Sequence, residues 1–218
     1  MDALDPQSAH NLDEAADHFA QTALQCRLRV VFGPTAGLEI SRISEEITIG
    51  PELAHWYGTH APLHDFEIPQ LGNFCTVYAP SRLVENQAGY RWSGRTSEGG
   101  WKRVSDWPEE WIVIADIGAD PVIADAGRRG TPISTAMIGA GEWYPEEIAP
   151  TLADYLEAHA RWMDICLIQT GAYNIQNWQE ANKKVWDADG HLLSDVADAL
   201  RRSLEEILAP THLANWLQ

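Results

Sequence analysis

The stretch WIVIADIGADPVIAD, residues 111–125, decides the fold of this chain. Two apolar segments rich in β-branched residues flank a short break that a single strand cannot absorb. Residues 112–117 alternate between two faces, and Gly118 permits a positive φ. Pro121 fixes its own φ before the extended pattern resumes at Val122. This stretch therefore predicts a β-hairpin.

The predicted hairpin carries three carboxylates, Asp116, Asp120 and Asp125. Such a group can perform general acid–base catalysis or hold a cation, but Asp120 before a proline and Asp125 at a strand end are ordinary turn chemistry. Alternation places Asp116 on the same face as Ile112 and Ile114. A half-buried carboxylate there needs a donor, such as an arginine or an indole N–H, and could mark a pocket.

Outward from the hairpin, sequence periodicity predicts the other elements. Strands are expected over residues 27–32, 38–41, 73–78 and 131–138. Helices are expected over residues 11–25, from a capping box of Asn11 and Glu14, over 51–60, ended by Pro62, and over 80–85. A long helix should follow Pro145, with Ile148, Leu152, Tyr155, Leu156, His159, Met163 and Cys166 on its buried side. A last helix should run from Leu193 to Ile207 and end at Pro210.

The order of these elements predicts the fold class. Strands cluster in the middle of the chain and helices at both ends, which favours an α+β fold over alternating βαβ units. We expect a central, mostly antiparallel sheet with helices packed on one face.

Composition and charge narrow the function classes. The chain has 218 residues, of which 45% are hydrophobic, enough for a globular core with extensions. Its net charge of −17 repels nucleic acid and anionic lipid and attracts basic partners. No apolar run reaches the roughly 18 residues that span a bilayer, and no export signal is apparent at the N-terminus. Three scattered cysteines (Cys26, Cys75 and Cys166) predict no disulfide framework and fit a reducing cytoplasm.

Neither a metal nor another cofactor is expected. His55, His60, His64 and Asp65 are capable ligands, but Pro62 interrupts the helix that would align them. His159 lies on an apolar helix side, which predicts a hydrogen-bonded core histidine. The segment at residues 139–141 resembles a phosphate cradle only superficially, because it lacks the P-loop pattern.

Tryptophans and acids suggest a binding surface. The chain has ten tryptophans, and five of them, Trp92, Trp101, Trp107, Trp111 and Trp143, could pack in the core or line a sugar-binding groove. Acids flank them at Glu109, Glu110, Glu142, Glu146 and Glu147. Because acids around aromatic anchors suit a basic protein partner, the predicted partner-binding residues are Glu109, Glu110, Asp116, Asp120, Glu142 and Trp143.

Four segments carry a resemblance to a known family: YAPSRL at residues 78–83, QAGYRW at 87–92, the hairpin at 111–125, and GAGEW at 139–143 before a helix. Together they resemble the SUKH superfamily, which includes fungal Smi/Knr cell-wall-assembly regulators and bacterial proteins that neutralise toxins. The resemblance implies an α+β core domain over residues 46–168. Residues 1–45 would form an N-terminal extension, and residues 169–218 a C-terminal helical extension packed on the core.

The resemblance and the acidic charge together imply a function. We expect a non-enzymatic immunity protein that neutralises a basic toxin domain, such as a nuclease, by stoichiometric occlusion. A regulatory module that binds a host protein is an alternative from the fungal relatives. A small hydrolase that uses the hairpin carboxylates is a third hypothesis.

Overall fold

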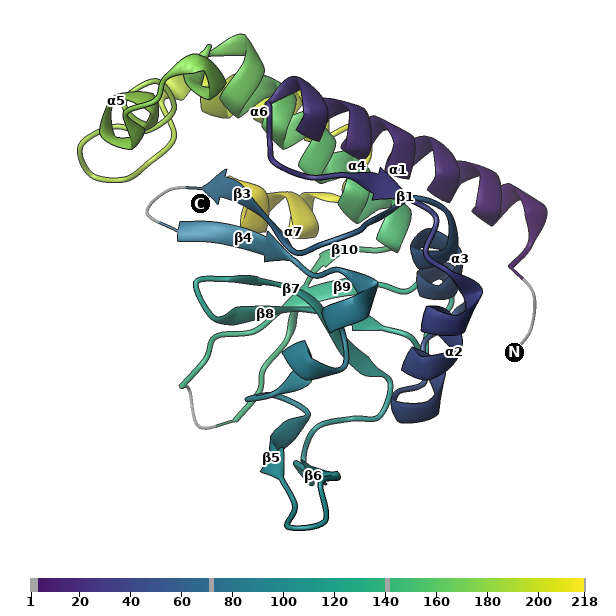
Figure 1. Ribbon diagram of the computed structural model, residues 1–218. Coiled ribbons are helices and arrows are strands. Elements are labelled where there is room, and N and C mark those ends of the chain that lie inside the picture. The colour runs from purple at the N-terminus through teal and green to yellow at the C-terminus, as the bar shows by residue number, and fades with distance from the viewer. Residues whose placement is uncertain (1–3, 71–72, 140–141, 218) are drawn as a thin grey trace.

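The computed structural model describes residues 4–70, 73–139 and 142–217 (Figure 1). Within them, a six-stranded sheet has the order β10-β9-β8-β7-β4-β3, and each strand is antiparallel to its neighbours. The strands are β3 (Phe66–Gln70), β4 (Asn73–Val77), β7 (Trp111–Ile117), β8 (Asp120–Asp125), β9 (Ile133–Thr135) and β10 (Glu146–Ala149). The predicted α+β class with a mostly antiparallel sheet is confirmed.

Helices lie on one side of this sheet and at its end (Figure 1). The α-helices are α1 (Pro6–Gln25), α2 (Gly37–Glu46), α3 (Pro51–Thr59), α4 (Leu152–Met163), α5 (Trp178–Asn182), α6 (Ser194–Leu204) and α7 (Pro210–Leu213). A π-helical segment, η3 (Asp164–Gln169), continues α4. Single turns of 3₁₀ helix are η1 (Pro80–Arg82), η2 (Glu85–Gln87), η4 (Ala172–Asn174) and η5 (Ala214–Trp216). Two short pairs, β1 (Phe32–Gly33) with β2 (Ala61–Pro62) and β5 (Trp92–Arg95) with β6 (Trp101–Arg103), complete the described elements.

The predicted hairpin is confirmed as β7 and β8. Its two-residue turn places Gly118 at φ 61° and Ala119 at φ 83°, the left-handed pair that matches the twist of the flanking strands. A β-bulge between Val113 and Ala115 shifts the register of the pairing. All four residues from Ile112 to Ala115 are at most 1% exposed, so the strand is covered on both faces.

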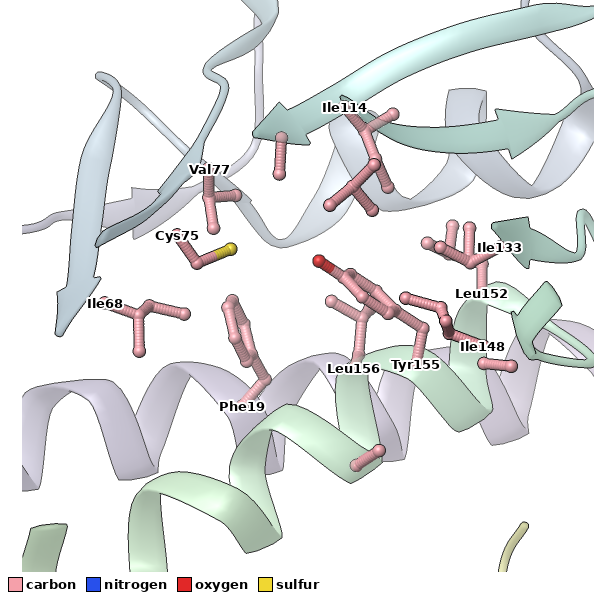
Figure 2. Close-up of a cluster of buried hydrophobic side chains, with 14 of the residues drawn as sticks. Phe19, Ile68, Cys75, Val77, Ile114, Ile133, Ile148, Leu152, Tyr155 and Leu156 are labelled. Atoms are coloured by element: carbon pink, nitrogen blue, oxygen red, sulfur yellow. The ribbon is translucent and has the colours of Figure 1, made fainter. Parts of the chain in front are cut away.

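The bulge also corrects the predicted orientation of Asp116. Cys75, Val77 and Ile114 point toward α1 and α4 (Figure 2). Asp116 pairs directly with Thr76, which lies between Cys75 and Val77 in β4. Because directly paired residues share a face and neighbours alternate, Asp116 points to the other face, opposite Ile114. The predicted alternation was wrong because the bulge inserts one extra residue.

The main core fills the space between the sheet and helices α1 and α4. Phe19 of α1 and Leu156 of α4 meet Ile68 of β3 and Ile114 of β7 (Figure 2). Each of these side chains is at most 1% exposed. Burial of a large aliphatic or aromatic side chain stabilises a fold by roughly 1.5–3 kcal/mol. The buried side predicted for the long helix is confirmed from Leu152 to Cys166.

Helix α1 begins earlier than predicted. Asp5 is its N-cap, the Asp5 carboxylate accepts the Ser8 backbone N–H at 3.0 Å, and Pro6 occupies the first helical position. The predicted capping box of Asn11 and Glu14 therefore lies inside the helix. A cap combined with a proline is the stronger start signal, because proline has no N–H to leave unpaired.

Two segments predicted as strands differ in the structure. Residues 38–41 belong to helix α2, where Ile40, Ile43 and the following Ile47 recur at helical spacing. Of residues 27–32, only Phe32 enters a strand. In α2 the packing of Ile43 and Ile47 into the core, where each is at most 2% exposed, decided the helical conformation.

Two strands of the six-stranded sheet were missed. β3 contains Pro69, which argues against a central strand but is tolerated at the sheet edge that β3 occupies. β10 contains Ile148, so the prediction that places Ile148 on the long helix is wrong. That helix begins only after Thr151, whose hydroxyl caps it by accepting the Asp154 N–H at 3.0 Å.

The C-terminal segment packs against the sheet and the helices. The predicted last helix is present as α6, with Val196, Leu200 and Leu204 buried. α7 begins at Pro210 and lies against β10. No helix within the described ranges is both long and apolar enough to cross a membrane.

Candidate partner-binding surface

Asp116, the hairpin acid singled out from the sequence, accepts a hydrogen bond from a tyrosine. The Tyr78 hydroxyl donates to Asp116 Oδ2 at 2.5 Å, and the Ala119 N–H approaches Oδ1 at 3.4 Å. The donor is a phenol rather than the expected arginine or indole. Burial raises the pKa of Tyr78, and its hydrogen bond to Asp116 raises it further, so the phenol stays protonated.

Asp120 ties the loop after β9 to the hairpin turn. Its Oδ1 accepts the Ile138 backbone N–H at 2.7 Å. This bond holds Ile138 beside the hairpin with 48% of its surface exposed, and the preceding Met137 is 71% exposed. The turn acid thus fixes an apolar segment in an outward position.

Aromatic side chains pack beside the hairpin turn that lies between Asp116 and Asp120. The Tyr90 hydroxyl donates to the Ala119 carbonyl at 2.7 Å, and the Tyr90 ring lies 5.9 Å from that of Trp143. Trp107 contacts Trp143 edge-on at 5.3 Å, and its indole N–H donates to the Trp111 carbonyl at 2.9 Å. Burial first, then Asp116 and Asp120, raises the pKa of Tyr90 to about 12. The Trp143 ring therefore packs against Tyr90 and Trp107 and is not free to insert into a partner.

The other tryptophans also use their ring faces for packing. Trp107 is 2% exposed and Trp92 is 6% exposed. Trp92 and Trp101 stack on each other at 6.0 Å, and the Arg95 guanidinium covers Trp101 at 4.0 Å. The faces that would stack on a sugar ring are occupied by protein, which favours the packing interpretation over the sugar-binding groove.

These contacts assemble one surface, which we call the tip surface. It combines exposed apolar and aromatic side chains with nearby carboxylates, and it comprises Asp116, Asp120, Met137, Ile138, Glu142 and Tyr144. Tyr144 is 67% exposed, and its hydroxyl donates to Glu142 at 2.5 Å. Apolar anchors rimmed by charge are typical of protein-binding surfaces.

Glu109 and Glu110, the remaining predicted site residues, lie at the opposite end of the hairpin. Both precede the pairing of Trp111 with Asp125, six strand residues or about 20 Å from the turn. Glu109 forms an ion pair with Arg103, and the Glu110 carbonyl accepts the Ala126 N–H at 2.9 Å. The structure therefore separates these two acids from Asp116, Asp120, Glu142 and Trp143.

Glu146 and Glu147, the two other acids near the tryptophans, differ in whether their charge is paired. Glu147 forms ion pairs with Arg128 at 2.9 Å and with His212 at 3.1 Å, so its negative charge is paired within the molecule. Glu146 is exposed in β10. The acidic rim expected from the sequence is thus divided between several places.

The histidines do not gather into a metal centre. His55 Nε2 lies 2.7 Å from Asp13, and His60 lies 3.3 Å from Asp13 and 3.1 Å from Asp17, which links α3 to α1. His64 contacts the Asp65 carbonyl instead. Across residues 4–70, 73–139 and 142–217, no three histidine, cysteine or acidic side chains are placed to hold a metal ion.

The thiols are not available as nucleophiles. Cys26, Cys75 and Cys166 are each at most 4% exposed. Burial raises the pKa of Cys26 and of Cys75 to about 12 and also raises that of Cys166. Since the thiolate is the reactive form, these cysteines are inert core residues at neutral pH.

Met137 and Ile138, the exposed aliphatic residues of the tip surface, were not predicted from the sequence as binding residues. Met137 and Ile138 fall in a predicted strand over residues 131–138, but β9 ends at Thr135. Their exposures of 71% and 48%, with the hydrogen bond from the Ile138 N–H to Asp120, place them at the surface beside the hairpin turn. Of the glycine segment discounted as a phosphate cradle, residues 140–141 lie outside the described residues.

Comparisons with known proteins do not assign the chain to a family. No family model matches it, and no curated protein matches it.

Proposed function

We propose that this protein binds a basic protein partner through the tip surface, with one molecule of this protein per molecule of partner. The observation that carries the proposal is the exposure of Met137, Ile138 and Tyr144 at 71%, 48% and 67%, next to carboxylates. Exposed apolar side chains rimmed by polar residues are typical of protein-interaction sites.

Charge complementarity supports a basic partner. Asp120 and Glu142 accept hydrogen bonds from Ile138 and Tyr144, and the whole chain carries a net charge of −17. Such a field speeds the encounter with a cationic protein and disfavours an anionic one. The exposed apolar residues would then provide the desolvated contact that holds the complex.

The resemblance to the SUKH superfamily supports a more specific role. In that role the protein is an immunity protein in the cytoplasm, and the partner is a toxin domain whose active site the tip surface covers. Nucleases and other enzymes that act on nucleic acid carry basic active-site surfaces, which fit an acidic inhibitor.

A hydrolase that uses the hairpin acids has less support. Asp116 accepts hydrogen bonds from Tyr78 and Ala119. Asp120 accepts one from Ile138. Both carboxylates thus have structural partners, and the raised pKa values of Tyr78 and Tyr90 keep these phenols protonated at neutral pH, where they cannot act as general bases.

The test uses the purified product of the gene adjacent to that of this chain. Isothermal titration calorimetry should show one molecule of this protein bound per molecule of that product. Tyr144→Ala combined with Ile138→Asp should weaken binding at least 100-fold, because the anchor is lost and a charge is placed at its centre. Leu24→Asp is the matched control, since Leu24 is 55% exposed on α1, across the sheet from the face of Asp116.

Co-expression separates immunity from regulation. If the adjacent product is toxic, the wild-type chain should rescue growth and the double variant should not. Binding without rescue would overturn the immunity role and support the regulatory one. Absence of binding, or equal loss in the Leu24→Asp control, would refute the tip surface as the site.

A further inference from the structure

The sulfur-bearing side chains differ sharply in exposure, and one of them lies in the tip surface. The structure describes five of them: Cys26, Cys75, Cys166, Met137 and Met163. Met1 lies outside the described residues. The three thiols and Met163 are each at most 4% exposed, whereas Met137 is 71% exposed. Among these five, an oxidant dissolved in water therefore reaches the sulfur of the surface that we assign to the partner.

The protonation of the thiols adds to this difference. Cysteine is oxidised through its thiolate form. Burial raises the pKa of Cys26 and of Cys75 to about 12 and also raises that of Cys166, so these groups stay protonated at neutral pH. A thioether has no proton to lose, so access to the sulfur decides how fast it reacts. Met137 is the favoured target on both counts.

The backbone on either side of Met137 is anchored. Before it, β9 ends at Thr135 and Ala136 is only 4% exposed. After it, the Ile138 N–H donates to Asp120 at 2.7 Å. The Met137 side chain is therefore held at the surface next to the exposed Ile138.

Oxidation changes what this side chain contributes to a protein contact. A methionine thioether is apolar and adapts to the shape of a partner, whereas the sulfoxide is polar. Burying the sulfoxide oxygen against apolar surface removes its hydrogen bonds to water without replacement. The net charge of −17 does not change, so the attraction of a basic partner persists while the short-range contact weakens.

We propose that Met137 is a redox-sensitive contact of the tip surface, and that its oxidation by hydrogen peroxide weakens partner binding. The inference rests on the proposed function and adds its regulation. The Met137 sulfur attacks one peroxide oxygen, so an S–O bond forms and the O–O bond breaks. The sulfur loses two electrons to the second oxygen, which leaves as hydroxide and takes the proton of the transferred hydroxyl group to become water. A methionine sulfoxide reductase reverses the change with two thiols, which become a disulfide while the oxygen leaves as water.

Mass spectrometry tests the chemistry without a partner. The full chain is treated with hydrogen peroxide and then digested. The peptide that contains Met137 should gain one oxygen atom at least tenfold faster than the peptide that contains Met163. Treatment in urea, which unfolds the chain, should make the two rates similar. Equal rates in the folded chain would overturn the inference.

Calorimetry with the purified product of the adjacent gene tests the consequence, after the peroxide has been removed. The oxidised wild type should bind at least tenfold more weakly than the untreated one, and methionine sulfoxide reductase with dithiothreitol should restore the affinity. Met137→Leu is the matched control, because leucine keeps a similar apolar volume without the sulfur. It should bind like the untreated wild type and should not respond to peroxide. Met137→Gln should weaken binding without peroxide, because its amide is polar at a similar length.

The outcomes separate this inference from the function on which it rests. If the untreated wild type does not bind, the proposed function fails and the inference fails with it. If the untreated wild type binds and the oxidised form binds equally well, only the inference is overturned. The same holds if peroxide weakens binding of Met137→Leu by the same factor as that of the wild type.

Discussion

Gln87 is fully buried, and its side-chain amide takes the place of a neighbouring strand. Its Oε1 accepts the Val113 N–H at 2.9 Å, while its Nε2 donates to the Val113 carbonyl at 2.8 Å and to the Leu83 carbonyl at 2.9 Å. These bonds satisfy the backbone of β7 at the bulge, beyond its pairing with β4. A single residue thus closes a gap in the sheet.

We expect Gln87→Ala to lower the free energy of unfolding by about 3 kcal/mol, because it leaves buried backbone groups unpaired and opens a cavity. Urea denaturation measures this change. Gln21→Ala, at an exposed position of α1, should change the value by less than about 0.5 kcal/mol. A similarly small effect at Gln87 would show that its hydrogen bonds contribute little.

His159 is a core histidine, as expected from its helix face, but its hydrogen bonding differs from the expectation. It is 2% exposed, and its ring packs against those of Phe19, Tyr155 and Trp216. Its Nδ1 has no hydrogen-bond partner in the described residues. Burial lowers its pKa to about 3, so the ring is neutral when folded.

This neutral histidine makes stability fall in mild acid. Above pH 6.5 both the folded and unfolded forms are uncharged there, whereas between pH 6.5 and about 3 only the unfolded chain binds the proton. From pH 7 to pH 5 this group should cost about 2 kcal/mol of unfolding free energy. His159→Phe should remove that part of the pH dependence, as measured by urea denaturation at both pH values. An unchanged pH dependence in His159→Phe, or the same loss of it in the exposed control His191→Gln, would contradict the assignment.

At the scale of elements, the C-terminal turn η5 covers one edge of the sheet. The Trp216 indole N–H donates to the Ile148 carbonyl of β10 at 3.0 Å, and its ring lies 4.9 Å from His159. Asn215 reaches the Glu147 carbonyl at 3.4 Å. An uncovered edge strand would offer these carbonyls to another chain, so the turn protects the sheet from aggregation.

Trp216→Ala should therefore lower the free energy of unfolding by about 3 kcal/mol and promote aggregation, because it removes a large packed ring and exposes β10. Trp216→Phe keeps most of the ring contact and should lose only about 1 kcal/mol with the hydrogen bond. Thermal unfolding followed by light scattering checks both effects. Equal losses in the two variants would show that the indole N–H, rather than the ring, dominates.

At the scale of the whole molecule, the net charge of −17 affects the rate at which a basic partner associates. Charge steering acts on the rate of encounter, and salt screens it. The short-range contacts of Ile138 and Tyr144 act instead on the rate of dissociation.

We expect the association rate constant with the basic partner to fall at least tenfold between 50 and 500 mM NaCl, while the dissociation rate constant changes less than threefold. Stopped-flow fluorescence of the tryptophans measures both. A salt-independent association rate would remove the argument from charge, although it would leave the apolar contact untouched.

Local sequence determined the parts of this fold whose signals lie within a few residues. The turn after Ile117 needs left-handed backbone that Gly118 allows, and the apolar spacing in α4 and α6 matches a helix over several turns. Because these signals are local, the hairpin, both helices and the α+β class could be predicted.

Tertiary structure decided where distant segments meet. Pro69 in β3 is tolerated only because that strand lies at an edge, and Asp116 faces Tyr78 only because of the bulge. The tip surface depends on Asp120 binding Ile138, eighteen residues away. Such contacts are set by packing and hydrogen bonds between elements, which no local pattern of residues encodes.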